Sequence, residues 1–280
     1  IPGLTKSVFL TIFVGLMSTV FSLFLSQLIL LKTYETRFYK YITKLITPLL
    51  AFPHLSMAVG ISFIFSSSGL LVRFFSFFFL DLDRPPNLNF FPDNFGFFLI
   101  LGLILKETPF FLLMSMNALT QFPAKNYLDL CKTLNHRSIS SWFLIIFPHL
   151  YKRIKISIII VLVYSATVVD MAYILAPSTP STLSIRIIEL YQQPEIQNIC
   201  FASSLCIIQL VIVLLLIFLI YIFEKKFKFG IFVRLYINCF PRKIEFFEKK
   251  LFILSISIMS VSILSILMIF FWSMSEYWNF

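Results

Sequence analysis

Six long apolar stretches alternate with shorter polar segments along this chain. Crossing a hydrocarbon layer of ~30 Å takes about 20 helical residues, and each stretch reaches or exceeds that length. The sequence therefore predicts an all-α, polytopic helical membrane protein with about six spans. The predicted helices run from Val8 to Leu31, Tyr41 to Phe65, Gly96 to Phe122, Ile154 to Ala176, Ile199 to Phe223 and Leu251 to Ser273.

The composition agrees with lipid as the solvent of this chain. Apolar residues make up 59% of it and charged residues only 13%, whereas soluble globular domains carry about 25% charged residues. The four cysteines form no C-x-x-C pair, and none stands near a histidine at the spacing of a zinc site. We therefore expect neither a metal nor a cofactor.

The net charge of +10 indicates an orientation in the membrane rather than a nucleic-acid partner, because the basic residues lie between the apolar stretches. The two poorly charged connections hold Arg73, Arg84 and Arg186, outnumbered by acidic residues. The positive-inside rule then predicts that residues 32–40, 123–153 and 224–250 lie in the cytoplasm. The three basic connections contain Lys32, Arg37, Lys40, Lys44, Lys125, Lys132, Arg137, Lys152, Arg153, Lys155, Lys225, Lys226, Lys228, Arg234, Arg242, Lys243, Lys249 and Lys250.

This orientation puts the first residue outside the cytoplasm. Because that residue is Ile1 rather than Met, we expect an earlier membrane span to be missing from the sequence. The apolar run from Leu70 to Leu80 is too short to cross the bilayer. We expect it to lie flat at the outer interface or to pack on the helices before and after it.

Ionisable residues interrupt two of the predicted spans. Lys106 and Glu107 precede Pro109, which should free a backbone carbonyl and kink the helix, and Asp170 lies in another apolar run. Charges at membrane depth cost a few kcal/mol each and are kept where they find partners. We expect Asp170 to pair with Lys106. Two interpretations stay open: the charges border a translocation path or its gate, or they form an architectural ion pair.

The predicted cytoplasmic segment from Asn126 to Leu150 has the features of a docking projection. A short helix from Tyr127 to Leu134 would present an apolar stripe of Leu130 and Leu134, with Asp129 on its flank. Asn135 suits the left-handed conformation that ends a helix. A second short helix, from Ser138 to Phe147, would then lead to Pro148.

The same segment resembles the coupling segment of ABC importer permeases, the binding-protein-dependent transport inner-membrane components. Asp129, Leu130 and Cys131 take the family's Glu-Ala-Ala positions, Asn135 its glycine position, and Phe147-Pro148 its Leu-Pro, while Trp142 falls where an aromatic is favoured. The resemblance implies a type I, MetI-like importer transmembrane domain. The residues implied to dock an ATPase are Asp129, Leu130, Cys131, Leu134, Asn135 and Pro148.

The resemblance also implies the domain organisation and the partners. Residues 1–225 would form the transmembrane domain with five core spans and the coupling segment 126–150, residues 226–250 a basic cytoplasmic linker, and residues 251–280 the first span of a second half. KETPFFLLM and VVDMAYILAPSTPSTLSIRIIELYQQPE are similar to permeases associated with thiamine and ferric iron. Implied partners are an ATPase dimer, a periplasmic solute-binding protein, a second permease half and the lipid bilayer.

Two other function classes are weighed against the permease. The sequence holds no G-x-x-x-x-G-K-[ST] phosphate loop, so any ATP hydrolysis is expected from a partner rather than from this chain. An ion-coupled secondary transporter would use Lys106, Glu107 and Asp170 as a relay and need no ATPase. A membrane-embedded enzyme would need a nucleophile or a metal cluster, and the sequence shows neither.

Overall fold

The computed structural model describes residues 3–80, 91–133, 138–226 and 245–274, and these residues form helices without strands. The all-α fold is thereby confirmed. Two π-helical turns, η1 (Ser76–Leu80) and η2 (Trp142–Ile146), continue neighbouring helices. The α-helices are α1 (Leu4–Thr33), α2 (Arg37–Ala51), α3 (His54–Phe65), α4 (Leu70–Phe75), α5 (Phe97–Thr120), α6 (Ala124–Thr133), α7 (Ser138–Ser141), α8 (Phe147–Thr167), α9 (Asp170–Leu175), α10 (Leu183–Tyr191), α11 (Ile196–Lys226) and α13 (Glu245–Met274).

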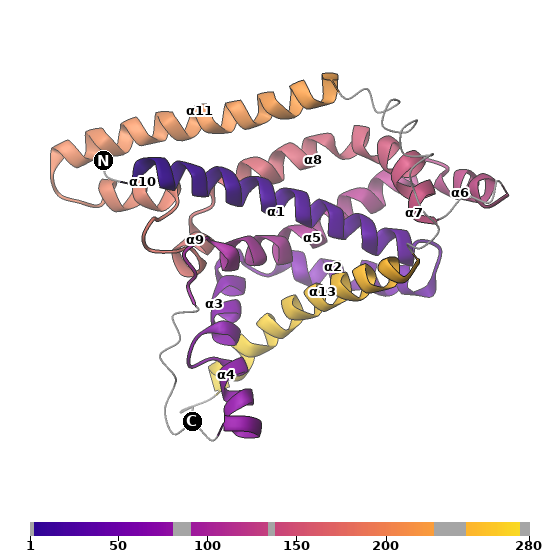
Figure 1. Cartoon of the computed structure of the whole chain (residues 1–280), viewed down its shortest axis with the longest axis horizontal. Coiled ribbons are helices and arrows are strands. Elements are labelled where there is room, and N and C mark those ends of the chain that lie inside the picture. Colours follow the sequence, from indigo (N-terminus) through magenta and orange to yellow (C-terminus); the bar gives the residue numbers. More distant parts are fainter. Residues whose placement is uncertain (1–2, 81–90, 134–137, 227–244, 275–280) are drawn as a thin grey trace.

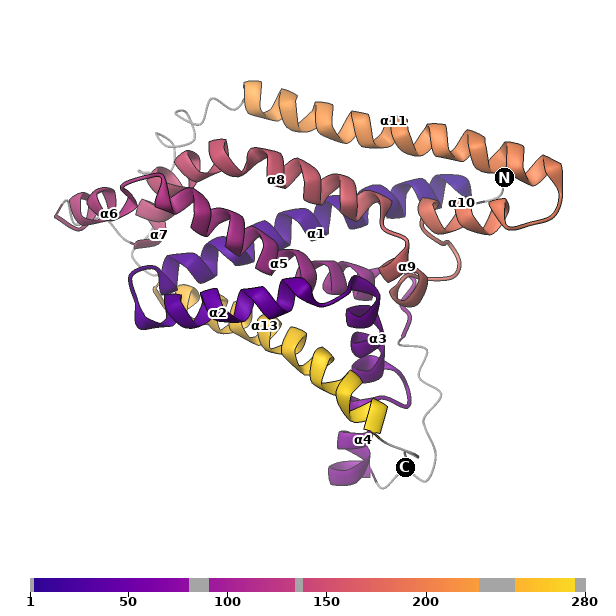
Figure 2. The same ribbon diagram turned by 180° about the vertical axis from the view of Figure 1, so that it is seen from behind.

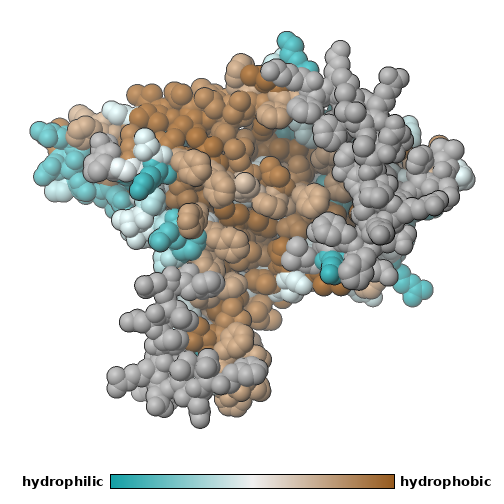
Figure 3. Space-filling view, viewed as in Figure 1, coloured by the Kyte–Doolittle hydropathy of each residue, from teal (hydrophilic) through white to brown (hydrophobic). Residues whose placement is uncertain are grey.

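Within the described residues, five helical segments are long and apolar enough to cross a membrane, so the chain is a multi-pass membrane protein. They are Leu4–Thr33, His54–Phe78, Phe97–Thr120, Ile196–Lys225 and Ser255–Met274. The predicted number of about six spans roughly matches these five. Helix α8, which was predicted as part of a span, is not among them. Its first turns carry Lys152, Arg153 and Lys155, which shorten its apolar part. The surface seen in Figure 3 is hydrophobic over the middle of the bundle, with hydrophilic residues mainly toward its ends.

Two predicted spans are broken in the structure, which corrects the expected helices from Tyr41 to Phe65 and from Ile154 to Ala176. Extended backbone at Phe52 and Pro53 separates α2 from α3, because proline disfavours helical conformation in the residue before it. Extended backbone at Val168 separates α8 from α9. Pro109, by contrast, lies inside α5 without interrupting it.

The helices are arranged so that α5 lies at the centre (Figure 1). In α5, 72% of the most apolar window is buried, against 44% or less in the other four candidate spans. The ends of α1 and α11, the starts of α2 and α13, and α6 and α7 gather at one end of the bundle in both views (Figures 1 and 2). These ends flank the three basic segments, so the fold brings together the segments that the charge pattern assigns to the cytoplasm.

The segment from Leu70 onward extends from the end of α3, where the turn of α4 continues into η1 (Figure 1). The guanidinium of Arg73 lies 6.0 Å from the ring centroid of Trp272 in α13. Phe74, Phe77 and Phe78 are exposed. The segment thus contacts α3 and α13, and the hydropathy of its sequence makes it part of the candidate span His54–Phe78.

Helix α13 packs against the bundle through buried serines. The hydroxyl of Ser262 donates to the carbonyl oxygen of Leu105, 3.4 Å away. This is the carbonyl that Pro109 leaves without its usual helical donor. Where α13 crosses α3, a Cβ atom added to Gly60 would lie only 2.3 Å from the carbonyl oxygen of Ser265. Small residues therefore allow the two backbones to approach closely, as is common between membrane helices.

We expect Gly60→Val to push α13 away from α3 and to destabilise the chain by about 1–3 kcal/mol. The physical reason is that the new side chain meets the backbone of Ser265, which cannot rotate aside. The measurement is crosslinking by a bifunctional thiol reagent between cysteines placed at Phe63 and Trp272, whose ring centroids lie 4.6 Å apart. Leu55→Val, on an exposed position of α3, is the control. Undiminished crosslinking in Gly60→Val would show that the crossing tolerates bulk.

Candidate functional site

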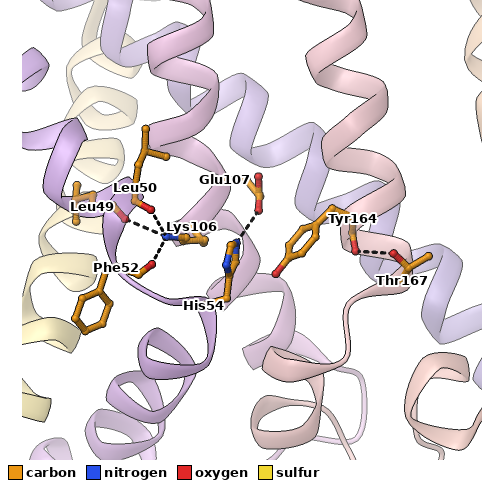
Figure 4. A network of polar contacts seen from close by, with 8 residues as sticks. All are labelled: Leu49, Leu50, Phe52, His54, Lys106, Glu107, Tyr164 and Thr167. Atoms are coloured by element: carbon orange, nitrogen blue, oxygen red, sulfur yellow. Dashed lines mark hydrogen bonds and ion pairs between the residues drawn. The ribbon is translucent and has the colours of Figure 1, made fainter. Parts of the chain in front are cut away.

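Lys106 lies in the bundle centre with its ammonium group at the break between α2 and α3 (Figure 4). The side-chain nitrogen donates to the carbonyl oxygens of Leu49 and Leu50, each at 3.1 Å, and to that of Phe52. The last carbonyls of a helix lack intrahelical donors, and a cation there is favoured by the helix dipole. Lys106, only 4% exposed, therefore caps the carboxyl end of α2.

The expected pairing of Lys106 with Asp170 is wrong within the described residues. All three hydrogen-bond donors of the ammonium group are used by backbone carbonyls. Asp170 instead begins α9, where an acidic side chain in the first turn is favourable. Because the predicted span is broken before Asp170, the carboxylate lies at the start of a new helix instead of in the middle of a long one.

Glu107 faces a histidine that the sequence analysis left without a role. The carboxylate Oε1 lies 3.9 Å from Nε2 of His54, and Glu107 is only 6% exposed. The His54 ring also packs on Tyr164, with the ring centroids 4.9 Å apart. Nothing in the sequence marks this contact, because His54 follows the α2–α3 break and Glu107 lies on another helix. Figure 4 shows the three side chains between α3, α5 and α8.

The polar groups thus form a cluster beside the break between α2 and α3. This polar cluster consists of His54, Lys106, Glu107 and Tyr164. Pro109 lies buried one turn further along α5. The ammonium group of Lys106 caps α2, whereas the carboxylate of Glu107 lies at the longer distance of 3.9 Å from His54. Within the described residues, no three His, Cys, Asp or Glu side chains are placed to hold a metal ion. The arrangement offers a carboxylate, an imidazole and a phenol beside the extended backbone that joins α2 to α3.

At the predicted cytoplasmic end, α6 projects from the bundle (Figures 1 and 2). Asp129 and Leu130 are exposed, Leu130 by 60%, whereas Cys131 is buried and faces the protein. Lys132 donates to Asp129 at 2.8 Å, and this hydrogen bond lowers the pKa of the Asp129 carboxyl. Leu134 and Asn135 lie outside the described residues. The exposed part of the predicted docking surface is thus Asp129 and Leu130, without Cys131.

The second helix of this segment does not end at Phe147 as expected. The chain is helical from α7 through η2 into α8, and Pro148 lies in the first turn of α8. Proline has no N–H to donate to the preceding turn, and that turn is the π-helical η2, whose altered bonding stands directly before Pro148. Trp142, Ile146 and Leu150 are fully buried against residues of α1 and α5. The segment therefore has a projecting part, α6, and an anchored part, η2 with the start of α8.

A comparison with curated proteins finds similarity across about half of this chain. It is the inner membrane ABC transporter permease protein YnjC of Escherichia coli (strain K12), 30% identical over 140 residues, which are 49% of this chain and 25% of that protein. The chain thus matches about a quarter of the length of this curated relative. No family model matches the chain. No solved structure matches it either.

Proposed function

We propose that this chain is a permease subunit of an ATP-binding-cassette importer in the bacterial inner membrane. The observation that carries the proposal is the projecting helix α6, whose exposed Asp129 and Leu130 extend from a bundle of membrane-spanning length. The similarity to an inner membrane ABC transporter permease supports it. The chain would form the solute path and couple it to a separate ATPase.

In the proposed mechanism, α6 and the residues that follow it, including Leu134 and Asn135, dock in a groove of an ATPase dimer. A periplasmic solute-binding protein would deliver solute to the opposite end. A second permease half would complete the path. Nucleotide states that bind one conformation better than the other supply the free energy for alternating access. Pro148 and the buried η2 would carry the movement of α6 into the bundle.

Lys106, Glu107, Pro109 and Asp170 are proposed to border the translocation path or its gate. The support is that α2 and α3 are joined at extended backbone beside Lys106, so a hinge there would move the carbonyls that hold the ammonium group. Glu107→Gln removes the charge while Lys106 keeps its cap. Lost transport in a normally inserted variant supports the gate, and wild-type transport rejects it.

The finer assignments rest on the resemblance of the sequence. We propose that the solute is of the small-solute class handled by permeases associated with thiamine and ferric iron. Residues 251–280 would begin a second half after the linker 226–250. Helix α13 packs on α3 and α5. This packing supports a close association between α13 and the helices that precede it in the chain.

A second candidate function, an ion-coupled secondary transporter, is favoured by the contact between His54 and Glu107. Two adjacent titratable groups in a membrane bundle are the usual elements of a proton relay. This alternative predicts transport in vesicles that contain the chain but no ATPase. The importer predicts none without ATP and the partner subunit.

The experiment that tests the importer is site-specific crosslinking from α6. We expect a photoreactive side chain at Asp129 or Lys132 to crosslink to an ATPase subunit in native membranes, because both residues are exposed on the projecting helix. The same side chain at Glu189, exposed on α10 at the other end of the bundle, should not. Crosslinks from α6 to its own chain alone would refute the assignment.

A further inference from the structure

A buried glutamine joins the anchored part of the cytoplasmic segment to two membrane helices. The side-chain nitrogen of Gln27, in α1, donates to the hydroxyl of Ser115 in α5 at 2.9 Å. The side-chain oxygen of Gln27 accepts from the indole N–H of Trp142 in η2 at 3.4 Å. All three residues are fully buried. One amide group thus holds three elements together.

The relay of Gln27, Ser115 and Trp142 differs from most other buried polar contacts of α1. Thr11 also bonds outside its helix, accepting from the backbone N–H of Leu183 in α10 at 2.9 Å. Buried serines and threonines of α1, such as Ser18 and Thr19, bond to carbonyls of their own helix. Gln27 bonds only to other elements. A buried donor or acceptor that loses its partner carries the full cost of its lost hydration. The amide therefore specifies one position of Trp142 relative to α5, which apolar packing alone does not.

Helix α5 connects the relay to the polar cluster. Ser115 is on the same helix as Lys106, nine positions further along the chain, which is about 13 Å along an α-helix. The α-helix is continuous between them. A displacement of Trp142 would therefore shift α5 and, with it, Lys106 against the carbonyl end of α2.

We propose that Gln27 is the positioning residue that transmits movement of the cytoplasmic segment to α5 and so to the polar cluster. This inference rests on the proposed function, because it takes α6 to be the part that an ATPase moves. Gln27 itself contacts neither the ATPase nor the solute. It fixes the register between η2 and α5.

The first test uses the full chain alone in lipid nanodiscs. Spin labels at Asn126 on α6 and Lys44 on α2, both exposed, report how firmly the segment is held. We expect Gln27→Leu to widen the distance distribution, because η2 loses the hydrogen bonds through the amide that fix its position against α1 and α5. The matched control is Gln209→Leu, which removes a buried amide bonded to Ser184 and Ala166 at the other end of the bundle. An unchanged width in Gln27→Leu overturns the inference.

The second test uses the chain together with the ATPase subunit that crosslinks to α6. Labels at Asn94 and Glu189 report the nucleotide-dependent change at the opposite end of the bundle. We expect Gln27→Leu to keep the crosslink while the change falls about tenfold. Ser115→Ala combined with Gln27→Leu should lower it no further, because both act through one contact. Additive losses would show that Gln27 and Ser115 do not act through one contact, and that result also overturns the inference.

The two tests separate failure of the inference from failure of the proposed function. A normal response in Gln27→Leu with an intact crosslink rejects the role of Gln27 and leaves the importer standing. Absence of any ATPase crosslink in the unaltered chain rejects the importer, and force transmission through Gln27 fails with it.

Discussion

The Leu130→Asp variant is expected to lose its ATPase partner, with binding weakened about 30- to 1,000-fold, the range that truncation of a central interface residue produces. Leu130 is an apolar side chain, 60% exposed on a projecting helix. In the proposed complex it would be buried in the groove of the ATPase, where a carboxylate would have no partner. The new carboxylate would also stand next to the carboxylate of Asp129, whose pKa is lowered by the hydrogen bond from Lys132. The two negative charges would repel each other.

The measurement is co-purification of the ATPase subunit with the solubilised chain, followed by titration of the purified components. Phe38→Asp is the matched control, because Phe38 is also exposed, by 68%, at the same end of the bundle but lies in α2. Its binding should stay within about threefold of the unaltered chain, as for residues outside an interface. Equal binding by Leu130→Asp and the unaltered chain would show that α6 is not the docking element.

The Lys106→Met variant is expected to lose about 3 kcal/mol or more of stability, because breaking a buried charged contact leaves its partners without hydrogen bonds. Those partners are the carbonyls of Leu49, Leu50 and Phe52 at the end of α2. Methionine fills a similar volume, so the loss reports the hydrogen bonds rather than a cavity. Thermal unfolding of the chain in detergent measures the change.

Two companion variants make this result decisive. Lys125→Met removes an exposed lysine that lies 3.6 Å from Glu35, and it should cost less than about 1 kcal/mol, as surface ion pairs do. Asp170→Leu distinguishes the helix cap from the ion pair that the sequence suggested. If the cap holds Lys106, Asp170→Leu costs clearly less than Lys106→Met. Equal losses in both variants would restore the ion pair.

The cytoplasmic segment shows how far a local pattern reaches. The sequence predicted a helix at Tyr127–Leu134 with an exposed Leu130, and α6 is a helix with that residue exposed. The predicted end of the second helix at Phe147 was wrong. Proline both ends helices and begins them, and only the π-helical turn before Pro148 shows that the helix continues here. The partner of Trp142 could not be predicted, since Gln27 is 115 residues away in the chain.

The polar cluster shows the same limit. The intramembrane positions of Lys106 and Glu107 were evident from the sequence, because a charge in an apolar run is a local feature. Their partners were not. The carbonyls that hold Lys106 belong to residues 54 to 57 positions earlier, and they are free only because α2 ends before Pro53. Because the apolar pattern predicted one continuous span over α2 and α3, these carbonyls were not expected to be available.

By itself, the sequence determined the class of this protein, a multi-pass helical membrane chain, and predicted that its basic segments lie on one side of the membrane. Apolar length and charge asymmetry act through the bilayer, which is the same for every residue, so no long-range contact is needed to predict them. Only the tertiary structure decided which polar groups meet, including Ser262 with the Leu105 carbonyl that Pro109 frees. Such pairs depend on helix rotation and crossing, which packing of the whole bundle sets.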